Sequence, residues 1–422
     1  MSRGAVSGPP NKLVVLVCAL AISLLVACSS GGTGDTGAAA GSPSPSGDPA
    51  QMAQIEKVAR DSMQKYDVRA LIVQVTKDGQ NIYTGAMGTS MTGVPATTDM
   101  HFRSGSFGFT YIGEIFAKLV DEGKVSLDDP LSTWRPDLPQ ADRISVRNLL
   151  NMTAGYADYV YQPSLLKAYS RDPFRQWSNE ELIDIGVSAP MLFEPGTNWA
   201  YSHTNYVILG EVLQGITGRP MADVMREYVI EPMGLTGTST NDNTPAIPEP
   251  VLHSYSSERR ADLGVPASEY FYEEATFWNP SWTTAEGAVL TSTIGDIGRS
   301  MTIVGSGEQV SPEMYQEQVG PNLVGFGEKD PTGKCPACAQ NTETGSYGLG
   351  VVLLGPWITQ TMNFGGLGAT SGYLPSDGLT ISVATTYEPE AFDSEGLYAN
   401  ASTEIFKAFT EVLAPDQALP GA

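Results

Sequence analysis

The stretch that decides the fold of this chain runs FRSGSFGFTYIGEIFAKLVDEGKVSLDDPL over residues 102–131. Near its start, Ser106 stands before apolar residues spaced three and four apart, which is the spacing of one face of a helix. Serine is also a preferred residue at the N-cap of a helix. We therefore expect a helix that begins near Ser106 and buries an apolar stripe made of Phe109, Ile112, Phe116, Leu119 and Val120.

The same stretch resembles the nucleophile helix of the serine β-lactamase and penicillin-binding-protein-like superfamily, in its class C β-lactamase-related and esterase branch. By this resemblance Ser106 is the nucleophile, and the family has a lysine three residues after it. This chain has Phe109 at that position, and the spacing from Ser106 to Gly123 matches the family without an insertion. The lysine has therefore been replaced and not displaced.

Several other blocks carry the same resemblance. Residues 201–203 read Tyr-Ser-His where the family has Tyr-Ser-Asn. Gly366 takes the place of the histidine or lysine in the strand motif that the family writes as His-x-Gly or Lys-Thr-Gly. The remaining blocks are residues 144–155, which resemble a segment ending in His-Thr-Ser-Gly, residues 193–196, Leu209-Gly210, residues 285–287 with Thr293 and Asp296, and Gly372-Tyr373.

The residue patterns and the resemblance together predict an α+β fold, with an antiparallel sheet flanked by helices and a mainly helical subdomain. We expect a helix at 51–66, a hairpin turning at Asp78-Gly79, and a final helix at 396–413. Further strands are expected at residues 347–354, 357–362, 370–375 and 379–386. The predicted domain covers residues 51–422, with an α/β half from about 51–100 and 345–415, a helical half at about 101–300, and a surface excursion at 305–346.

The resemblance implies an active site between the two halves, with Ser106, Tyr201 and His203 as its catalytic residues. It also implies that Phe109, Gly366, Leu367 and Gly368 line the binding cleft. An acyl-serine mechanism needs the serine proton removed as its oxygen attacks. Without the family's amines, a tyrosine near its reference pKa of about 10 is ionised in only about one molecule per thousand at pH 7, a handicap of roughly 4 kcal/mol.

Alternatives remain open for each of these residues. His203 could replace the missing base, because imidazole titrates near neutral pH, or it could hold a loop or a ligand amide. Ser106 could be a helix cap, Phe109 a core residue, and Tyr201 a packed aromatic with a satisfied hydroxyl.

The sequence therefore predicts a serine-hydrolase-fold protein with an impaired catalytic set, at most a slow acyl-serine hydrolase. The expected ligand is a cell-wall peptide or a small amide or ester. The alternative is a pseudoenzyme that binds or regulates without catalysis, and a weaker idea makes the 305–346 excursion the working surface.

The N-terminus has the pattern of an export signal. Residues 1–27 carry two basic residues and then an apolar run, and they end in the small residues before Cys28, as in a bacterial lipobox. We expect residues 1–27 to be a signal peptide, Cys28 to carry the lipid, and residues 28–50, rich in Ser, Gly and Pro, to be a disordered tether. The protein would then be exported and anchored to the cell membrane, facing outside the cytoplasm.

The net charge and the cysteines indicate which partners and which metal or disulfide sites to expect. The formal net charge is −23, so nucleic acid is not an expected partner. Cys335 and Cys338 are expected to pair as a local disulfide, because the protein is expected outside the cytoplasm. No metal site or cofactor is expected, since a zinc knuckle would need a second pair of ligands.

Overall fold

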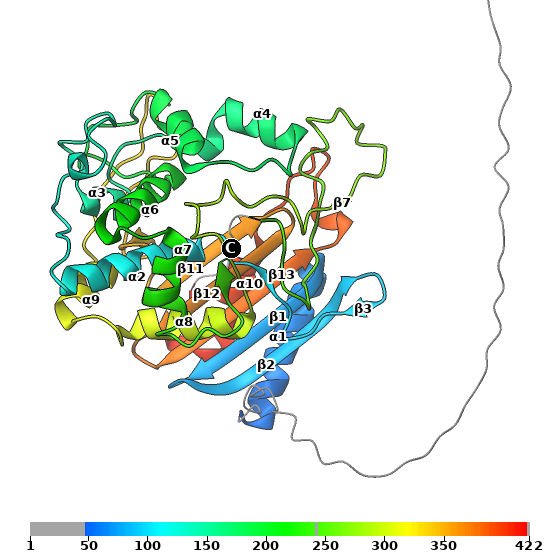
Figure 1. Ribbon diagram of the computed structural model, residues 1–422. Coiled ribbons are helices and arrows are strands. Elements are labelled where there is room, and N and C mark those ends of the chain that lie inside the picture. The colour runs from blue at the N-terminus through cyan, green and yellow to red at the C-terminus, as the bar shows by residue number, and fades with distance from the viewer. Residues whose placement is uncertain (1–46, 241–243, 420–422) are drawn as a thin grey trace, which may run out of the picture. The chain divides into compact units, whose positions relative to one another are not determined.

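Strands from both ends of the chain form one antiparallel sheet in the computed structural model, which describes residues 47–240 and 244–419 (Figure 1). Its order is β3-β2-β1-β13-β12-β11-β10-β9. The strands are β1 (Val68–Lys77), β2 (Gln80–Met91), β3 (Val94–Pro95), β9 (Ser346–Tyr347), β10 (Val352–Leu354), β11 (Trp357–Phe364), β12 (Leu367–Leu374) and β13 (Leu379–Tyr387).

Two-residue turns made of residues that tolerate positive φ set the register of the sheet. Asp78 and Gly79 have φ of 50° and 73°, and Lys77 pairs with Gln80 across the turn, so the predicted hairpin is confirmed. Gly365 and Gly366 make the β11–β12 turn in the same way, with φ of 52° and 73°.

The expected strand at 347–354 is divided in two. Gly350 has a φ of 84°, and a Cβ there would lie 2.5 Å from the Phe109 carbonyl oxygen. The backbone leaves the sheet at this point in order to approach the helix that follows Ser106, and only β9 and β10 remain as strands.

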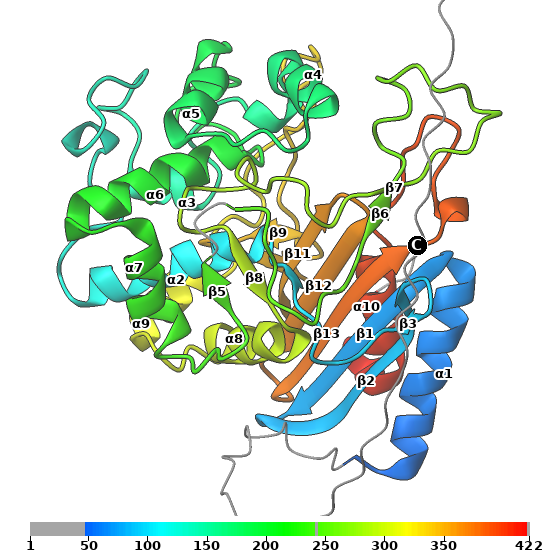
Figure 2. The ribbon, with the colours of Figure 1, turned by 45° about the vertical axis from the view of Figure 1, so that its right-hand side comes forward.

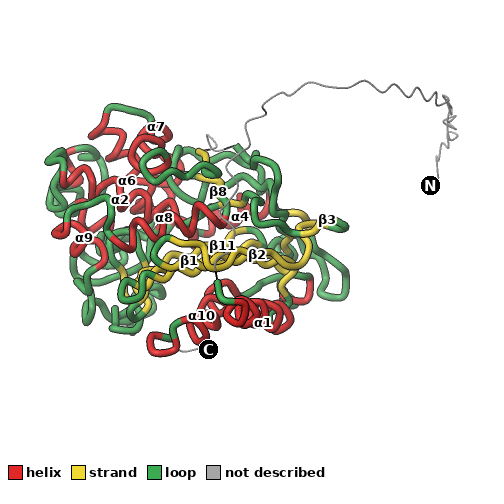
Figure 3. The backbone as a smooth tube through the Cα atoms, turned by 90° about the horizontal axis from the view of Figure 1, so that it is seen from below, coloured by secondary structure: helices red, strands yellow, loops and turns green. Residues whose placement is uncertain are grey.

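Two helices cover one face of the sheet, as Figure 3 shows from below. They are α1 (Pro49–Lys65) and α10 (Ala401–Leu413), one from each end of the chain. Ile55, Ile405 and Phe409 are fully buried between these helices and the strands. Asp48 caps α1 through the Ala50 amide at 2.7 Å, so Pro49 and Ala50 belong to the helix and not to the expected tether.

The opposite face carries α8 (Ile294–Ser306), α2 (Phe107–Asp121) and the helical half of the chain (Figure 2). The helical half contains α3 (Val146–Leu150), α4 (Pro163–Arg171), α5 (Asn179–Ser188), α6 (His203–Thr217) and α7 (Met221–Met225). One apolar core joins the helices to the sheet, and its large members include Phe107, Phe116, Tyr206 and Phe364. Both faces of β12 and β13 are therefore buried along their whole length.

Short elements complete the described chain. They are β4 (Phe102–Arg103), β5 (Ser239–Thr240), β8 (Leu290–Ser292), β6 (Tyr255–Ser256), β7 (Glu273–Glu274) and the single turns η1 (Leu131–Thr133), η2 (Tyr159–Tyr161), η3 (Arg226–Ile230), η4 (Pro389–Ala391) and η5 (Pro415–Gln417). The expected excursion at 305–346 includes a helix, α9 (Pro312–Val319).

The predicted signal peptide and Cys28, the residue predicted to carry the lipid, lie outside the described residues. Of the helices within residues 47–240 and 244–419, none is long and apolar enough to cross a membrane.

Candidate active site

Ser106 stands where the sheet and the helical half meet. Gly105 before it has a φ of 51°, and a Cβ there would lie 2.8 Å from Cβ of Met362 on β11, so glycine lets the turn pack directly against the strand. Ser106 occupies the N-cap position of α2 with helical dihedrals. Within the described chain its hydroxyl makes no capping hydrogen bond, which removes the reading of Ser106 as a side-chain cap.

Phe109 fills the position one helical turn after Ser106. Its side chain is completely buried and stacks on Tyr206, with ring centroids 4.0 Å apart and planes 11° apart. Its ring centroid also lies 5.8 Å from that of Tyr201 and 5.3 Å from that of His203. The rings thus form an apolar aromatic cluster in which Phe109 is a core residue, not an exposed wall of a cleft.

His203 is the first residue of α6 and is held by a carboxylate that the sequence analysis did not single out. His203 Nδ1 lies 2.9 Å from Oδ2 of Asp158. The Asp158 side chain is 3% exposed and the His203 side chain 17% exposed. Asp158 follows the block at residues 144–155 by only three positions, but its distance of 45 residues from His203 gives no periodic signal that could have paired them.

Tyr201 lies beside both Ser106 and His203. Its ring centroid is 5.3 Å from that of His203, nearly perpendicular to it. Burial raises the pKa of Tyr201 well above its ordinary value, the neighbouring Tyr347 and Asp158 raise it further, and the Ser106 side chain beside it lowers it in part. These main influences include no cation, so Tyr201 is a neutral phenol across the physiological pH range.

The site thus combines a serine at the start of a buried helix, a tyrosine just before a second helix, and an adjacent antiparallel sheet. The profile described as Beta-lactamase matches residues 55–404. The chain belongs to the β-lactamase family.

This β-lactamase-family chain is similar to several characterised proteins. It is 30% identical to penicillin-binding protein 4 of Amycolatopsis lactamdurans, over 40% of this chain and 44% of that protein, so it spans less than half of that relative's length. It is 23% identical to esterase EstB of Burkholderia gladioli, over 65% of this chain and 75% of the esterase. The D-amino acid amidase of Ochrobactrum anthropi SV3 superposes with a TM-score of 0.70 at 22% identity, over 87% of this chain and 99% of the amidase, which confirms the predicted fold.

Gly366, which the resemblance placed in a strand motif of the site, lies in a turn instead. Gly366 is in the β11–β12 turn, and a Cβ there would lie 1.7 Å from the Tyr255 carbonyl oxygen. A Cβ on Gly368 would lie 2.4 Å from Oδ1 of Asn400, the N-cap residue of α10. Gly366, Leu367 and Gly368 are all buried, because these glycines serve a tight turn and close packing. They do not line an exposed cleft.

The strand beside Ser106 is instead β11. Besides Met362, it carries Gln360, which is 1% exposed and turned toward α2. Gln360 Nε2 donates to the Thr110 hydroxyl at 3.2 Å and to the Gly350 carbonyl oxygen at 3.0 Å. This part of the strand therefore presents neutral side chains to the serine helix.

The basic residues nearest to Ser106 in sequence, Arg103 and Lys118, form hydrogen bonds with groups other than Ser106. Arg103 donates through its guanidinium to the carbonyl oxygens of Thr244, Pro245 and Ala246. Lys118 on α2 donates to the Tyr228 carbonyl oxygen at 2.6 Å and lies 3.7 Å from Glu114.

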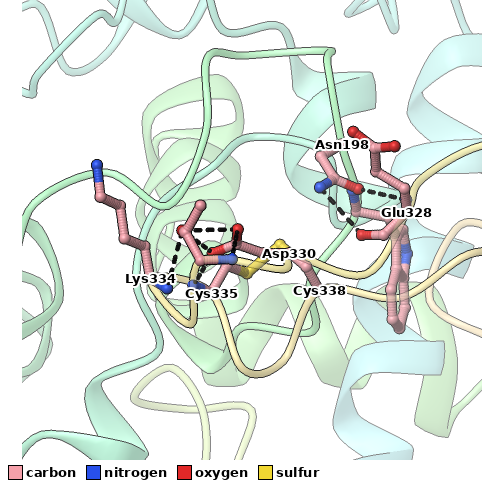
Figure 4. Close-up of a disulfide and its surroundings, with 8 residues drawn as sticks. Asn198, Glu328, Asp330, Lys334, Cys335 and Cys338 are labelled. Carbon is pink, nitrogen blue, oxygen red and sulfur yellow. Dashed lines mark hydrogen bonds between the residues drawn. A yellow bond between two sulfur atoms is a disulfide. The ribbon is translucent and has the colours of Figure 1, made fainter.

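The loop that carries the cysteines braces the segment before Tyr201. Cys335 and Cys338 are joined by a disulfide (Figure 4). Cys338 pairs with Ala200 in an isolated antiparallel β-bridge, and the Ala339 amide donates to the Trp199 carbonyl oxygen at 3.3 Å. Asn198 exchanges two hydrogen bonds with the backbone of Glu328, at 3.2 and 2.9 Å. The expected surface excursion is therefore also a support for the Tyr201 segment.

In the part of the chain that the structure describes, the side chains that could bind a metal ion are not clustered. Within residues 47–240 and 244–419, no group of three or more His, Cys, Asp or Glu side chains could hold an ion. Tyr201 lies beside Ser106, and His203 with its partner Asp158 lies next to the Tyr201 ring.

Proposed function

We propose that this protein is a cell-envelope serine hydrolase of the β-lactamase fold with an impaired catalytic set, in which Ser106 accepts acyl groups slowly from amide, ester or peptide ligands. The observation that carries the proposal is the state of Ser106. Its hydroxyl makes no helix-capping hydrogen bond and its side chain lies beside that of Tyr201, while Phe109 occupies the position of the family's lysine.

In the acylation step, the Ser106 oxygen bonds to the carbonyl carbon of the ligand, and the bond from that carbon to the leaving nitrogen or oxygen breaks. The hydroxyl proton passes to a base of the site and then to the leaving group. Water later releases the acyl group as a carboxylic acid. Every step uses proton transfer, so the identity of the base decides the rate.

Tyr201 is a poor base in this setting. Even at the reference pKa of about 10, forming its phenolate at pH 7 costs roughly 4 kcal/mol. Burial raises the pKa of Tyr201 further, so the cost exceeds that figure. Removing positioned acid–base help slows a reaction by a factor of about 10² to 10⁴. Ordinary lactamase turnover is therefore not expected.

The choice of ligand class rests on the relatives. A D-amino acid amidase shares the fold, and an esterase and a penicillin-binding protein are similar in sequence. Wall stem peptides contain amides of D-amino acids and belong to the same chemical class. A protein that acts on them has to face the wall, which agrees with the predicted export and the predicted lipid attachment at Cys28.

Two covalent probes test the proposal. The full chain is incubated with a fluorescent penicillin and, separately, with a fluorescent fluorophosphonate, and the Ser106→Ala variant is treated in the same way. Ser104→Ala is the matched control, because Ser104 is buried two residues away and its hydroxyl donates to the Leu290 carbonyl oxygen. Labelling lost only in Ser106→Ala supports the proposal, and no labelling by either probe contradicts it.

A second candidate function is supported by the packing of Phe109. An aromatic ring stacked on Tyr206 leaves the site without the amine that a fast hydrolase of this family uses, yet Ser106, Tyr201 and His203 still present polar groups. A pseudoenzyme that binds wall peptide would keep its affinity in Ser106→Ala. Calorimetric titration with a muramyl pentapeptide separates the two functions, because retained binding without labelling supports the binder.

A separate variant tests the proposed attachment of the protein to the membrane. Cys28→Ser should abolish incorporation of labelled palmitate and release the protein from the membrane fraction, whereas unchanged fractionation would contradict lipid anchoring.

A further inference from the structure

Asp158 uses both of its carboxylate oxygens to connect two segments. Oδ1 accepts a hydrogen bond from the Val160 amide at 3.0 Å, which caps η2. Oδ2 lies 2.9 Å from Nδ1 of His203. An ionised carboxylate has only acceptor atoms, so Nδ1 carries the hydrogen in this bond. The neutral imidazole then has its unprotonated nitrogen at Nε2.

The pairing of these two residues is fixed by backbone contacts on either side. Thr204, the neighbour of His203, donates through its hydroxyl to the Ala157 carbonyl oxygen at 2.7 Å. The same hydroxyl accepts from the Tyr159 amide at 3.2 Å. The residues before and after Asp158 are thus bound to the residue after His203, and this clamp holds the carboxylate opposite the imidazole.

Aromatic rings enclose the imidazole on its other sides. The ring centroid of His203 lies 5.3 Å from that of Phe109, 5.3 Å from that of Tyr201 and 6.0 Å from that of Tyr159. The carboxylate partner at Nδ1 is almost fully buried, yet 17% of the His203 side chain is exposed. Nδ1 is therefore used by the Asp158 carboxylate, and Nε2 is the ring nitrogen left to act as an acceptor.

We propose that Asp158 is a positioning residue that fixes His203 in the Nδ1–H tautomer and presents Nε2 as the proton acceptor for the Ser106 site. This inference rests on the proposed acyl-serine function and adds a base to it. The orienting carboxylate plays the part that it has in a serine–histidine–aspartate triad, where it holds the tautomer and stabilises the imidazolium. The family's lysine is not needed for this arrangement.

The proton balance of the step is complete without another reactant. As the Ser106 oxygen bonds to the ligand carbonyl, its proton moves to Nε2 of His203, directly or by way of Tyr201, whose side chain lies beside Ser106 and whose ring centroid is 5.3 Å from that of His203. The imidazolium is stabilised by the Asp158 carboxylate and returns the proton to the leaving nitrogen or oxygen. His203 is neutral again before water attacks the acyl group.

The side chains that face the imidazole come from three segments. Asp158 and Tyr159 come from the η2 segment and Tyr201 from the segment before α6. Helix α2 contributes the apolar Phe109. Tyr159 and Tyr201 have pKa values raised well above the ordinary range by burial, so Asp158 is the charged group among these neighbours at neutral pH.

Nitrogen NMR of the histidine rings tests the tautomer directly. The full chain contains three histidines, so tag-free protein labelled with ¹⁵N-histidine gives three imidazoles, and His203→Gln assigns the one of interest. In the wild type we expect a protonated Nδ1 and an unprotonated Nε2 at high pH. Asp158→Asn keeps an acceptor for the Val160 amide but offers an N–H to the ring, so the tautomer should reverse.

A second pair in the same molecule supplies the matched control. His253 Nδ1 lies 2.6 Å from Oε1 of Glu274. Glu274→Gln should alter the His253 signals and leave the His203 signals and all Ser106 chemistry unchanged. A wild-type His203 that carries its proton on Nε2, or that keeps its tautomer in Asp158→Asn, would overturn the proposal.

The functional readout is the rate of Ser106 labelling by a fluorophosphonate between pH 5 and 9. Asp158→Asn should slow labelling by roughly 10²-fold and remove the rise with pH that follows imidazole deprotonation. Equal rates and equal pH profiles in Asp158→Asn and wild type would show that Asp158 only caps η2. A wild type that is never labelled at Ser106 would refute the proposed function instead, and the NMR result would still decide the role of Asp158.

Discussion

Phe109 and Tyr206 stack face to face, with centroids 4.0 Å apart and an angle of 11° between their rings. Phe109 lies one helical turn after Ser106, and both its neighbours in the site, Tyr201 and His203, touch the same aromatic cluster. Such a pair contributes about 0.5–1.5 kcal/mol beyond the burial of its surface. Phe109 thus contributes to the stability of the core and places an aromatic ring, not an amine, at position 109.

Restoring the amine should help catalysis only if its charge is paired. In Phe109→Lys alone, the ammonium replaces a fully buried ring among aromatic neighbours, and we expect a loss of unfolding free energy of about 3 kcal/mol or more. Adding His203→Asn replaces the imidazole with a shorter side chain and removes the ring nitrogen that Asp158 contacts. The Asp158 carboxylate can then pair with the new lysine. The double variant should recover stability and acylate Ser106 with penicillin at least about tenfold faster than the wild type.

Thermal unfolding and stopped-flow acylation measure these two effects, with Phe109→Leu as the apolar control. A histidine at position 366 is left out of the design, since a Cβ there would collide with the Tyr255 carbonyl oxygen. A double variant no faster than the wild type would show that the missing amine does not limit the rate.

Tyr201 should not act as a phenolate. Burial raises its pKa well above the ordinary value, so the neutral phenol persists as pH rises through 10. We expect the Ser106 labelling rates of the wild type and of Tyr201→Phe to run parallel between pH 8 and 10. A rise near pH 9 that disappears in Tyr201→Phe would contradict this expectation.

The disulfide should matter more for the site than for global stability. Cys335 and Cys338 are separated by only three positions, so the cross-link contributes about 2 kcal/mol in the chain-entropy model. Cys338 pairs with Ala200 in a β-bridge. Reduction of the disulfide should therefore speed hydrogen exchange at residues 198–201 and slow any labelling of Ser106.

Mass spectrometry of exchanged peptides, with and without a phosphine reductant, measures this change. In the Cys335→Ser/Cys338→Ser variant the reductant should have no further effect. Exchange at 198–201 that is unaffected by reduction would show that the loop is held by its other contacts, such as the bonds of Asn198 to Glu328.

Glu258 should make the protein less stable as pH rises. Burial raises the pKa of this carboxyl, although the Ser256 hydroxyl donates to it at 2.8 Å and lowers the pKa in part. A folded-state pKa above the unfolded one means that stability is complete below the unfolded pKa and falls as pH rises through the folded pKa. Glu258→Gln should therefore raise the Tm at pH 7 by about 2 °C and have no effect near pH 3.

Calorimetric scans at the two pH values give the comparison, and Glu269→Gln serves as control because Glu269 is exposed in the same region. Equal Tm values for Glu258→Gln and wild type at pH 7 would show that water solvates the carboxylate.

Much of the fold could be predicted from local patterns. The turn at Asp78-Gly79, the helix after Ser106 and the strand predicted at 379–386, which is β13, follow from residues that are neighbours in sequence. The glycines at 365 and 366 show where this reasoning fails. Their spacing resembled a strand motif of the site, but both have positive φ and make a hairpin turn, and only the packing of Tyr255 against that turn distinguishes the two uses.

The sequence by itself determined the scaffold and the position of its serine. The spacing of the apolar residues after Ser106 specifies a buried helix. Ser106 stands at the start of that helix, and an aromatic residue follows it by one turn. The tertiary structure alone decided which groups serve that serine. Asp158 meets His203 across 45 residues, and the cysteine loop meets the Tyr201 segment across more than a hundred, because such contacts depend on how helices and loops pack. A hydrogen bond between distant segments leaves no period in the chain, whereas burial of a helix face does.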